Sequence, residues 1–258
     1  MPVEDDFERH AEYAAETDRL LHLTKQGLLW IRNQPEAMKA LDNWERVRGG
    51  YDEARAQARR QHAEEVAVIA AAEVDRGFPL LHAHATVALW STAESCIESI
   101  LVTWLVEHPA ELKCEALTKV RISLTEFETL DVEDRMRYLL DELKRSTKAE
   151  LKLGVGRFEA LLEALGLTGG VPATLRRDLL ELSQIRNVLV HRAGIVDKRL
   201  AEACPWLQLQ TSNRVQVTHE AYTRYSLAVP QYVGSVRKRL EERRNVKDRN
   251  SGDTILNS

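Results

Sequence analysis

Long stretches rich in Ala, Leu, Glu and Arg run through this chain with few residues to interrupt them. The 258 residues include only 12 glycines and 7 prolines. Ala, Leu, Glu and Arg are strong helix formers, whereas Gly and Pro tend to end helices. The sequence therefore predicts an all-α fold, in a chain long enough to bury a proper core.

Composition and charge narrow the classes of function. The formal net charge of −4 excludes a broad basic surface, so nucleic-acid binding would require a local patch. Cys96, Cys114 and Cys204 are widely spaced, which is typical of reduced thiols rather than of a disulfide framework or a metal site. The N-terminal residues lack the apolar segment of a secretory signal, and no run of about 18 apolar residues occurs. We therefore expect a cytoplasmic protein without a membrane span.

Residues 1–77 are expected to form an N-terminal helical extension. Apolar residues recur at helical spacing from Phe7 to Ile31. Pro35 suits the first turn of a short helix, which Gly49-Gly50 would end. A long helix is then expected from Tyr51 to Arg76.

Residues 78–244 are expected to form a helical bundle, followed by a flexible tail at 245–258. The helices predicted for this bundle are Pro79–His108, Asp131–Arg145, Phe158–Leu165, Pro172–His191 and Glu220–Arg244. Arg214 to Thr218 alternates apolar and polar residues, which favours a strand paired with Leu207–Gln210 in one small β-hairpin.

The helix that ends near His191 carries a polar face. At 100° per residue, Asn187 and His191 lie one turn apart on this face, together with Ser183 and Gln184. We expect these four side chains to be exposed and to line a groove. Arg186 leaves the helix elsewhere, among apolar residues, where an unpaired charge is unfavourable.

An acidic partner for Arg186 is expected on the apolar helix that begins at Pro79. Glu94 lies in the middle of the apolar face of that helix, beside Trp90 and Ile97. A buried carboxylate needs a cation. We therefore predict that Glu94 and Arg186 pair between packed helices, so that the guanidinium faces a groove beside His191.

The segment Arg186-Asn187-Val188-Leu189-Val190-His191 resembles the signature of the HEPN superfamily, in which Arg is followed a few residues later by His, often with Asn directly after the Arg. The order of helices is also similar, and the resemblance covers roughly residues 78–244. It implies a metal-independent endoribonuclease of the toxin or phage-defence kind, with a composite site at a two-fold dimer interface.

The residue types suit this chemistry. Imidazole titrates near neutral pH, so His191 could take a proton from an RNA 2′-hydroxyl or give one to the leaving 5′-oxygen. Arg186 could stabilise the charge of the phosphorane-like transition state, and Asn187 could orient the phosphate. One histidine cannot easily act as both base and acid, which favours a homodimer with two copies of the motif. No cofactor or metal is required, and the product would carry a 2′,3′-cyclic phosphate.

One position departs from a pattern within the superfamily. HEPN toxins that are silenced by a nucleotidyltransferase carry a modified Tyr two residues after the motif His, and here that position is Ala193. This mode of control is therefore in doubt, whereas an antitoxin or another defence-system partner protein stays open.

Two other classes of function compete with the nuclease. In a non-catalytic HEPN-like interaction module, Arg186 and Glu94 would form a structural ion pair. His191 would then be a helix C-terminal residue favoured by the helix dipole. A helical scaffold without a nucleic-acid role is the third hypothesis.

Three further features of the sequence have a structural interpretation and not a functional one. A second Arg-x4-His segment, Arg214 to His219, crosses the strand-like stretch and is interpreted as a coincidence. His82 and His84 lack the spacing of a helical zinc pair and are interpreted as core or edge residues. The basic run from Arg237 to Arg249 includes acidic residues and is interpreted as a solvated face.

Overall fold

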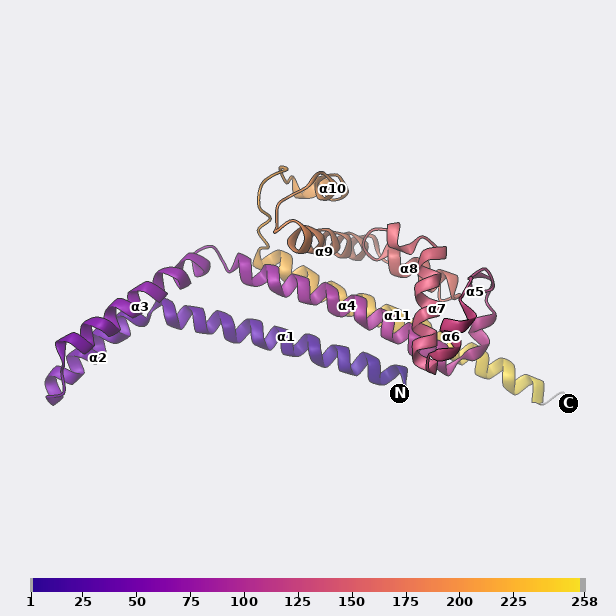
Figure 1. Ribbon diagram of the computed structural model, residues 1–258, viewed down its shortest axis with the longest axis horizontal. Helices are drawn as coiled ribbons and strands as arrows, with labels where there is room; N and C mark the ends of the chain where they lie inside the picture. Colours follow the sequence, from indigo (N-terminus) through magenta and orange to yellow (C-terminus); the bar gives the residue numbers. More distant parts are fainter. Residues whose placement is uncertain (1, 256–258) are drawn as a thin grey trace. The chain divides into compact units, whose positions relative to one another are not determined.

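The computed structural model describes residues 2–255, with side chains placed for residues 2–246 (Figure 1). Eleven α-helices account for most of these residues, which confirms the all-α prediction. Their bounds are α1 Val3–Arg32, α2 Gln34–Arg48, α3 Glu53–Val74, α4 Pro79–Glu107, α5 Glu115–Thr118, α6 Leu124–Thr129, α7 Val132–Ser146, α8 Gly156–Ala164, α9 Ala173–His191, α10 Lys198–Ala203 and α11 His219–Ile255. Short 3-10 helices lie at Pro109–Lys113, Ala149–Leu151 and Pro205–Leu207. No described helix is both long and apolar enough to cross a membrane.

Local signals in the sequence account for several helix ends. Asp131 caps α7 as predicted, because its carboxylate accepts a hydrogen bond from the Asp134 N–H at 2.9 Å. Asp52 caps α3 in the same way. Gly49 ends α2 in the left-handed region, with a φ of 84°, where a glycine is unstrained.

The chain divides into two compact units. Unit 1 contains the start of α1 as far as Ala14, the residues from Thr86 to Val215, and α11 from Thr223 onward. Unit 2 contains Ala15–Ala85 and Gln216–Tyr222. These units differ from the expected division at residue 77, because α1, α4 and α11 each contribute residues to both. In addition, α11 continues as a helix into the range expected to be a tail.

The core of unit 1 joins helices that are distant in sequence. The ring of Phe158 in α8 lies 5.6 Å from the Trp90 ring of α4 and 6.1 Å from the Tyr232 ring of α11, measured between centroids. At the start of α1, the buried Asp6 carboxylate accepts hydrogen bonds from Ser99 and Thr103 of α4, at 2.7 and 2.6 Å. Aromatic packing and a satisfied buried carboxylate thus hold this unit together.

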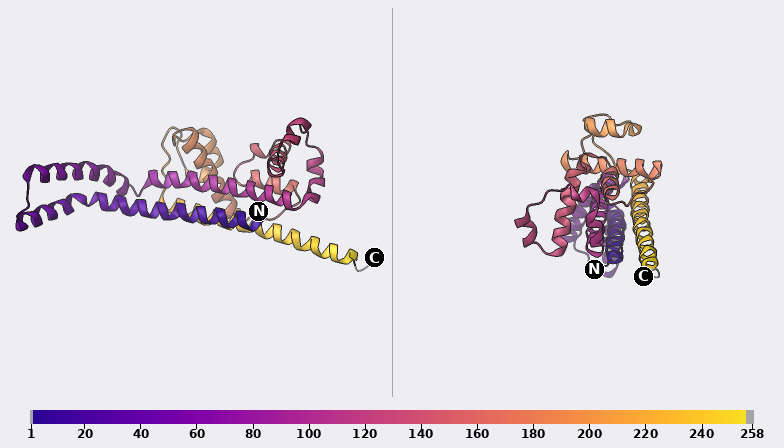
Figure 2. Two further views of the ribbon diagram at one scale, coloured as in Figure 1. Left: turned by 60° about the horizontal axis from the view of Figure 1, so that its bottom comes forward. Right: turned by 90° about the vertical axis from the view of Figure 1, so that its right-hand side faces the viewer.

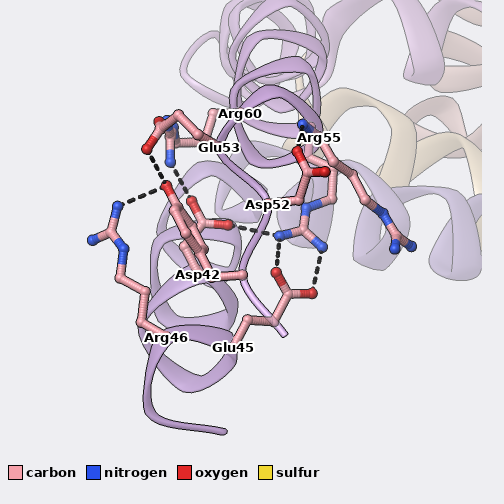
Figure 3. Close-up of polar contacts among 9 residues, drawn as sticks. Asp42, Glu45, Arg46, Asp52, Glu53, Arg55 and Arg60 are labelled. Atoms are coloured by element: carbon pink, nitrogen blue, oxygen red, sulfur yellow. Dashed lines mark hydrogen bonds and ion pairs between the residues drawn. The ribbon is translucent and has the colours of Figure 1, made fainter. Parts of the chain in front are cut away.

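Unit 2 includes the paired helices α2 and α3, which lie side by side in Figures 1 and 2. Charged side chains join them near the turn (Figure 3). The buried Asp42 carboxylate accepts hydrogen bonds from Arg59, at 2.8 Å, and from Arg60. Burial raises the pKa of the Asp42 carboxyl, but these hydrogen bonds outweigh it and bring that pKa below its ordinary value. Ion pairs between α2 and α3 therefore stabilise this helical pair.

The predicted β-hairpin between Leu207–Gln210 and Arg214–Thr218 is wrong. Among the described residues only an isolated bridge forms here, and it joins Arg214 to Ile195 instead. The alternation has another cause, because Val215 and Val217 are both buried in an extended segment. Burial of every second side chain produces the same pattern as a strand. The backbone hydrogen bonds of this segment run to Gly194 and Val196 instead of to Leu207–Gln210.

Candidate functional site

The motif lies on the last two turns of α9. This helix buries Leu179, Leu182, Ile185 and Val188 along one face. Its Glu181 is also buried and accepts hydrogen bonds from Trp206, at 2.7 Å, and Arg224, at 2.6 Å. Apolar packing and this clamp fix the direction of α9 within unit 1 and thereby place the motif residues.

Arg186 is held loosely. Its Nη2 lies 3.6 Å from Glu94 Oε2, so the predicted pair is present, and its Nη1 donates to Asn187 Oδ1 at 3.5 Å. Its Nε is buried and has no hydrogen-bond partner among the described residues. A guanidinium has five N–H donors. Arg186 therefore retains donor capacity beside Asn187.

Glu94 has a second cationic partner that the helical wheel did not predict. Arg157, in the first turn of α8, donates through Nη1 to Glu94 Oε1. The Glu94 side chain is 20% exposed, and those of Arg157 and Arg186 are 35% and 23% exposed. The single negative charge of Glu94 thus neutralises one of the two positive charges of these partly buried arginines.

The predicted exposed polar face of α9 needs a correction. Asn187 is half-buried and His191 is exposed, but Ser183 and Gln184 are only 3% and 2% exposed. The Ser183 hydroxyl donates to the Leu180 carbonyl at 2.8 Å, and the Gln184 amide donates to Ser183 Oγ at 3.3 Å. Together with the loop before α8 they line a pocket, of which these buried residues form the floor.

This polar pocket has a volume of about 190 Å³. Its lining residues come from α4, the loop before α8, α8, α9 and α10, all in unit 1; they are Trp90, Glu150, Lys152, Leu153, Gly154, Arg157, Ser183, Gln184, Asn187 and Arg199. Three of them are cations and one is an acid. Neither Arg186 nor His191 lines the pocket, although Asn187 lies between them in the sequence.

Gly154 brings the pocket wall against α9. Its φ is +54°, and a Cβ at this position would lie 2.9 Å from the Leu180 Cα atom. Only a glycine permits both the left-handed backbone and this close approach. The contact explains how Lys152 and Arg157, on either side of Gly154, come to lie beside Asn187.

Sequence reasoning missed the cations Lys152, Arg157 and Arg199. Gly154-Val155-Gly156 marked a loop and could have pointed to the first two. No sequence signal links Arg199, in α10, to α9, since that proximity depends on the tertiary fold. The second Arg-x4-His segment has no comparable setting, because residues 214–218 are not helical and His219 begins α11.

The other histidines and the cysteines singled out in the sequence are less suited to a catalytic or metal site. His82 is buried and His84, two residues further along α4, is exposed. Of the cysteines, all of which are free, Cys96 and Cys204 are buried and burial raises both thiol pKa values to about 12. Within the described residues, no cluster of three or more His, Cys, Asp or Glu side chains is arranged to hold a metal ion.

Comparisons of the chain with family models, curated proteins and solved structures found no match.

Proposed function

We propose that this protein is a metal-independent endoribonuclease of the HEPN-like toxin or phage-defence kind. The observation that carries the proposal is the guanidinium of Arg186, which pairs with Glu94 and lies beside Asn187. Asn187 in turn lines a pocket that contains three cations. A phosphodiester supplies the acceptors that such under-used donors require. His191 follows one helical turn after Asn187 and is exposed to a substrate.

In the proposed reaction the RNA 2′-oxygen attacks the adjacent phosphorus. A neutral His191 accepts the 2′-hydroxyl proton, the bond between phosphorus and the 5′-oxygen breaks, and a protonated imidazole donates a proton to that oxygen. Arg186 stabilises the negative charge of the transition state. The products are a 2′,3′-cyclic phosphate and a free 5′-hydroxyl.

The second proton-transfer group is proposed to be His191 of a second copy of the chain, so the active species is a homodimer. A protein of this kind acts on RNA in the cytoplasm and is restrained by an antitoxin or another defence-system partner protein. Ala193 follows the motif where a modifiable Tyr would stand, so that restraint is proposed to be non-covalent.

A non-catalytic helical module is the second candidate, and one observation favours it. His191 does not line the pocket and is the last residue of α9, a position where the helix dipole favours a basic side chain. In that case Arg186 and Glu94 hold helices together and nothing more.

RNA cleavage by the purified full chain in EDTA separates the two candidates. We expect the wild type to release cyclic-phosphate products and His191→Ala to be slower by roughly 100-fold or more. His84→Ala, which removes another exposed histidine, is the matched control and should cleave normally. An inactive wild type, or a His191→Ala variant with full activity, would overturn the nuclease proposal.

A further inference from the structure

Three surface hollows of unit 1 adjoin one another. The polar pocket beside Asn187 shares Lys152 with a hollow along α8, which Gly156, Glu159, Thr168 and Arg176 also line. It shares Leu153 and Arg199 with an open hollow beside α10. Because a cation lies at each junction, a chain-like anion could pass from one hollow to the next.

The two junction cations are available to a ligand. Lys152 and Arg199 are exposed, and no side-chain hydrogen bond or ion pair joins either of them to another described residue. Arg239 is the contrasting case, since it is buried and binds both carboxylate oxygens of Glu159 at 3.0 Å. Among the described residues that line the central pocket Glu150 is the only acid, so the unpaired charge there is positive.

Uncharged polar groups form the floor between these cations. Ser183 and Gln184 are nine-tenths or more buried, and Asn187 is half-buried. Together their side chains offer both hydrogen-bond donors and acceptors. Cations around a floor of hydroxyl and amide groups suit a phosphate joined to a ribose. The cations would bind the phosphate oxygens, and the hydroxyl and amide groups would form hydrogen bonds with the ribose hydroxyl.

The size and position of the pocket indicate how a strand would run. A volume of about 190 Å³ admits one backbone unit and excludes a double helix. Asn187 lines the pocket, and His191 lies one turn, or about 5.4 Å, further along α9. That rise is on the scale of one nucleotide step, so a phosphate in the pocket would place its neighbour near His191.

We infer that the Lys152–Arg199 pocket binds the backbone of a single RNA strand at a phosphate next to the one that reacts. The inference rests on the proposed function for the identity of the reacting phosphate. The flanking hollows carry the strand onward in both directions. Lys152 and Arg199 are binding residues here, and the reaction itself is left to Arg186, Asn187 and His191.

The test measures the affinity of a fluorescein-labelled single-stranded RNA by anisotropy, in full-length His191→Ala protein so that no cleavage intervenes. Adding Lys152→Ala and Arg199→Ala together should raise Kd at least tenfold. The slope of log affinity against log salt should fall by about 0.7 for each cation removed. DNA of the same sequence should bind more weakly than RNA, and duplex RNA should not respond to the two substitutions.

The matched control removes an exposed lysine and arginine of the same unit, Lys119 and Arg137, which pair only with acids of neighbouring turns. That double variant should keep the affinity and salt slope of its parent. Thermal melting of all variants checks that each is folded. An unchanged Kd for the pocket variant, a loss equal to that of the control, or equal loss of duplex binding would overturn the inference.

Cleavage kinetics with His191 intact distinguish this inference from the proposed function. We expect the pocket substitutions to raise KM more than they lower kcat, because the pocket binds ground state and transition state alike. If the wild type binds RNA through the pocket but never cleaves it, the nuclease proposal fails and the binding site stands. If the wild type cleaves RNA and the pocket variant keeps its affinity, the binding site alone is wrong.

Discussion

At the scale of single residues, Glu94 affects more than one partner, because two arginines share its carboxylate. Replacing it with Gln leaves Arg157 and Arg186 partly buried without a counter-charge. We expect a loss of about 1–3 kcal/mol in the free energy of unfolding, below the ~3–5 kcal/mol typical of a fully buried broken pair, since these side chains keep some contact with water. Urea unfolding measured by circular dichroism provides the value.

Glu98→Gln is the control for this change. Glu98 lies one turn further along α4 and pairs with Lys144 at 2.8 Å, but it is 40% exposed. Its loss should stay within about 1 kcal/mol, as for surface pairs. Equal losses for the two variants would mean that Glu94 behaves as a surface acid and does not organise Arg186.

His82 gives unit 2 a dependence on pH. Burial, together with Lys25 and His219, lowers the pKa of His82 from 6.5 to about 4, against the opposing effects of a backbone hydrogen bond with Val217 and of Glu73. Between pH 6.5 and about pH 4 the unfolded chain binds a proton at His82 that the folded chain does not bind. The full stability is therefore present above pH 6.5 and declines as the pH falls towards 4.

The expected decline from His82 is at most about 1.4 kcal/mol per pH unit. Unfolding by urea at pH 7 and pH 5 measures it. His82→Gln should flatten the dependence, whereas the exposed neighbour His84, changed to Gln, should leave it in place. A wild type equally stable at both pH values would show that His82 is protonated in the folded protein.

The pairing of Arg186 with Glu94 could be predicted because each residue interrupts an apolar helical face, and period 3.6 fixes such positions from sequence alone. The buried state of Ser183 and Gln184 could not. Their polar side chains suggest a solvent face, but the loop at residues 152–155 that lines the same pocket lies far earlier in the chain. The course of that loop depends on Gly154. Local periodicity reports which residues share a face and does not report what covers that face.

At the scale of elements, the long helices were predictable and the short ones were not. The bounds of α4, α7 and α9 lie within about two residues of those predicted, as is usual for strong periodicity and caps. In contrast α5, α6 and α10 have six residues or fewer, too short to show an apolar period. The omission of α10 matters most, because it contributes Arg199 to the pocket.

The contact between the Gly154 loop and α9 can be tested with one methyl group. Gly154→Ala places a Cβ against the Leu180 backbone at a φ of +54°, so we expect destabilisation by about 2 kcal/mol or more and weaker RNA binding. Gly166→Ala is matched in backbone conformation, with a φ of +70°, but its Cβ would meet only the end of the Arg243 side chain at 3.8 Å. It should lose about 1–2 kcal/mol from strain alone and keep RNA affinity. Similar losses of stability and of RNA affinity in both variants would show that the contact between Gly154 and α9 does not shape the RNA-binding pocket.

At the scale of the whole molecule, no sequence boundary marks the two units. The helices α1, α4 and α11 pass between them without a glycine-rich or proline-rich linker at residues 14, 85 or 222. The predicted division at residue 77 rests on Gly77, which has a φ of +78° and lies in the turn that follows the end of α3 at Val74. Helix ends can be read from local chemistry, whereas units are defined by contacts between distant segments.

Assembly is the last property to predict, because the proposed mechanism depends on it. Each chain offers one motif histidine, and His191 is exposed, as are the apolar side chains of Val190 and Ile195 near it in the sequence. An isologous contact through these residues brings each His191 towards its copy and covers apolar surface. We therefore expect a homodimer in solution, which sedimentation at assay concentrations measures directly.

Subunit mixing then tests whether each active site of the dimer uses His191 from both subunits. Wild-type and His191→Ala chains are co-expressed in equal amounts, so that random pairing leaves about one quarter of the dimers with both histidines. A composite site predicts about one quarter of the all-wild-type activity, because mixed dimers lack either the acid or the base, whereas independent sites predict about one half. Mixing with Lys119→Ala chains controls for co-expression and should leave activity unchanged. One half of the activity, or an active monomer in the centrifuge, would require a second proton-transfer group within the same chain.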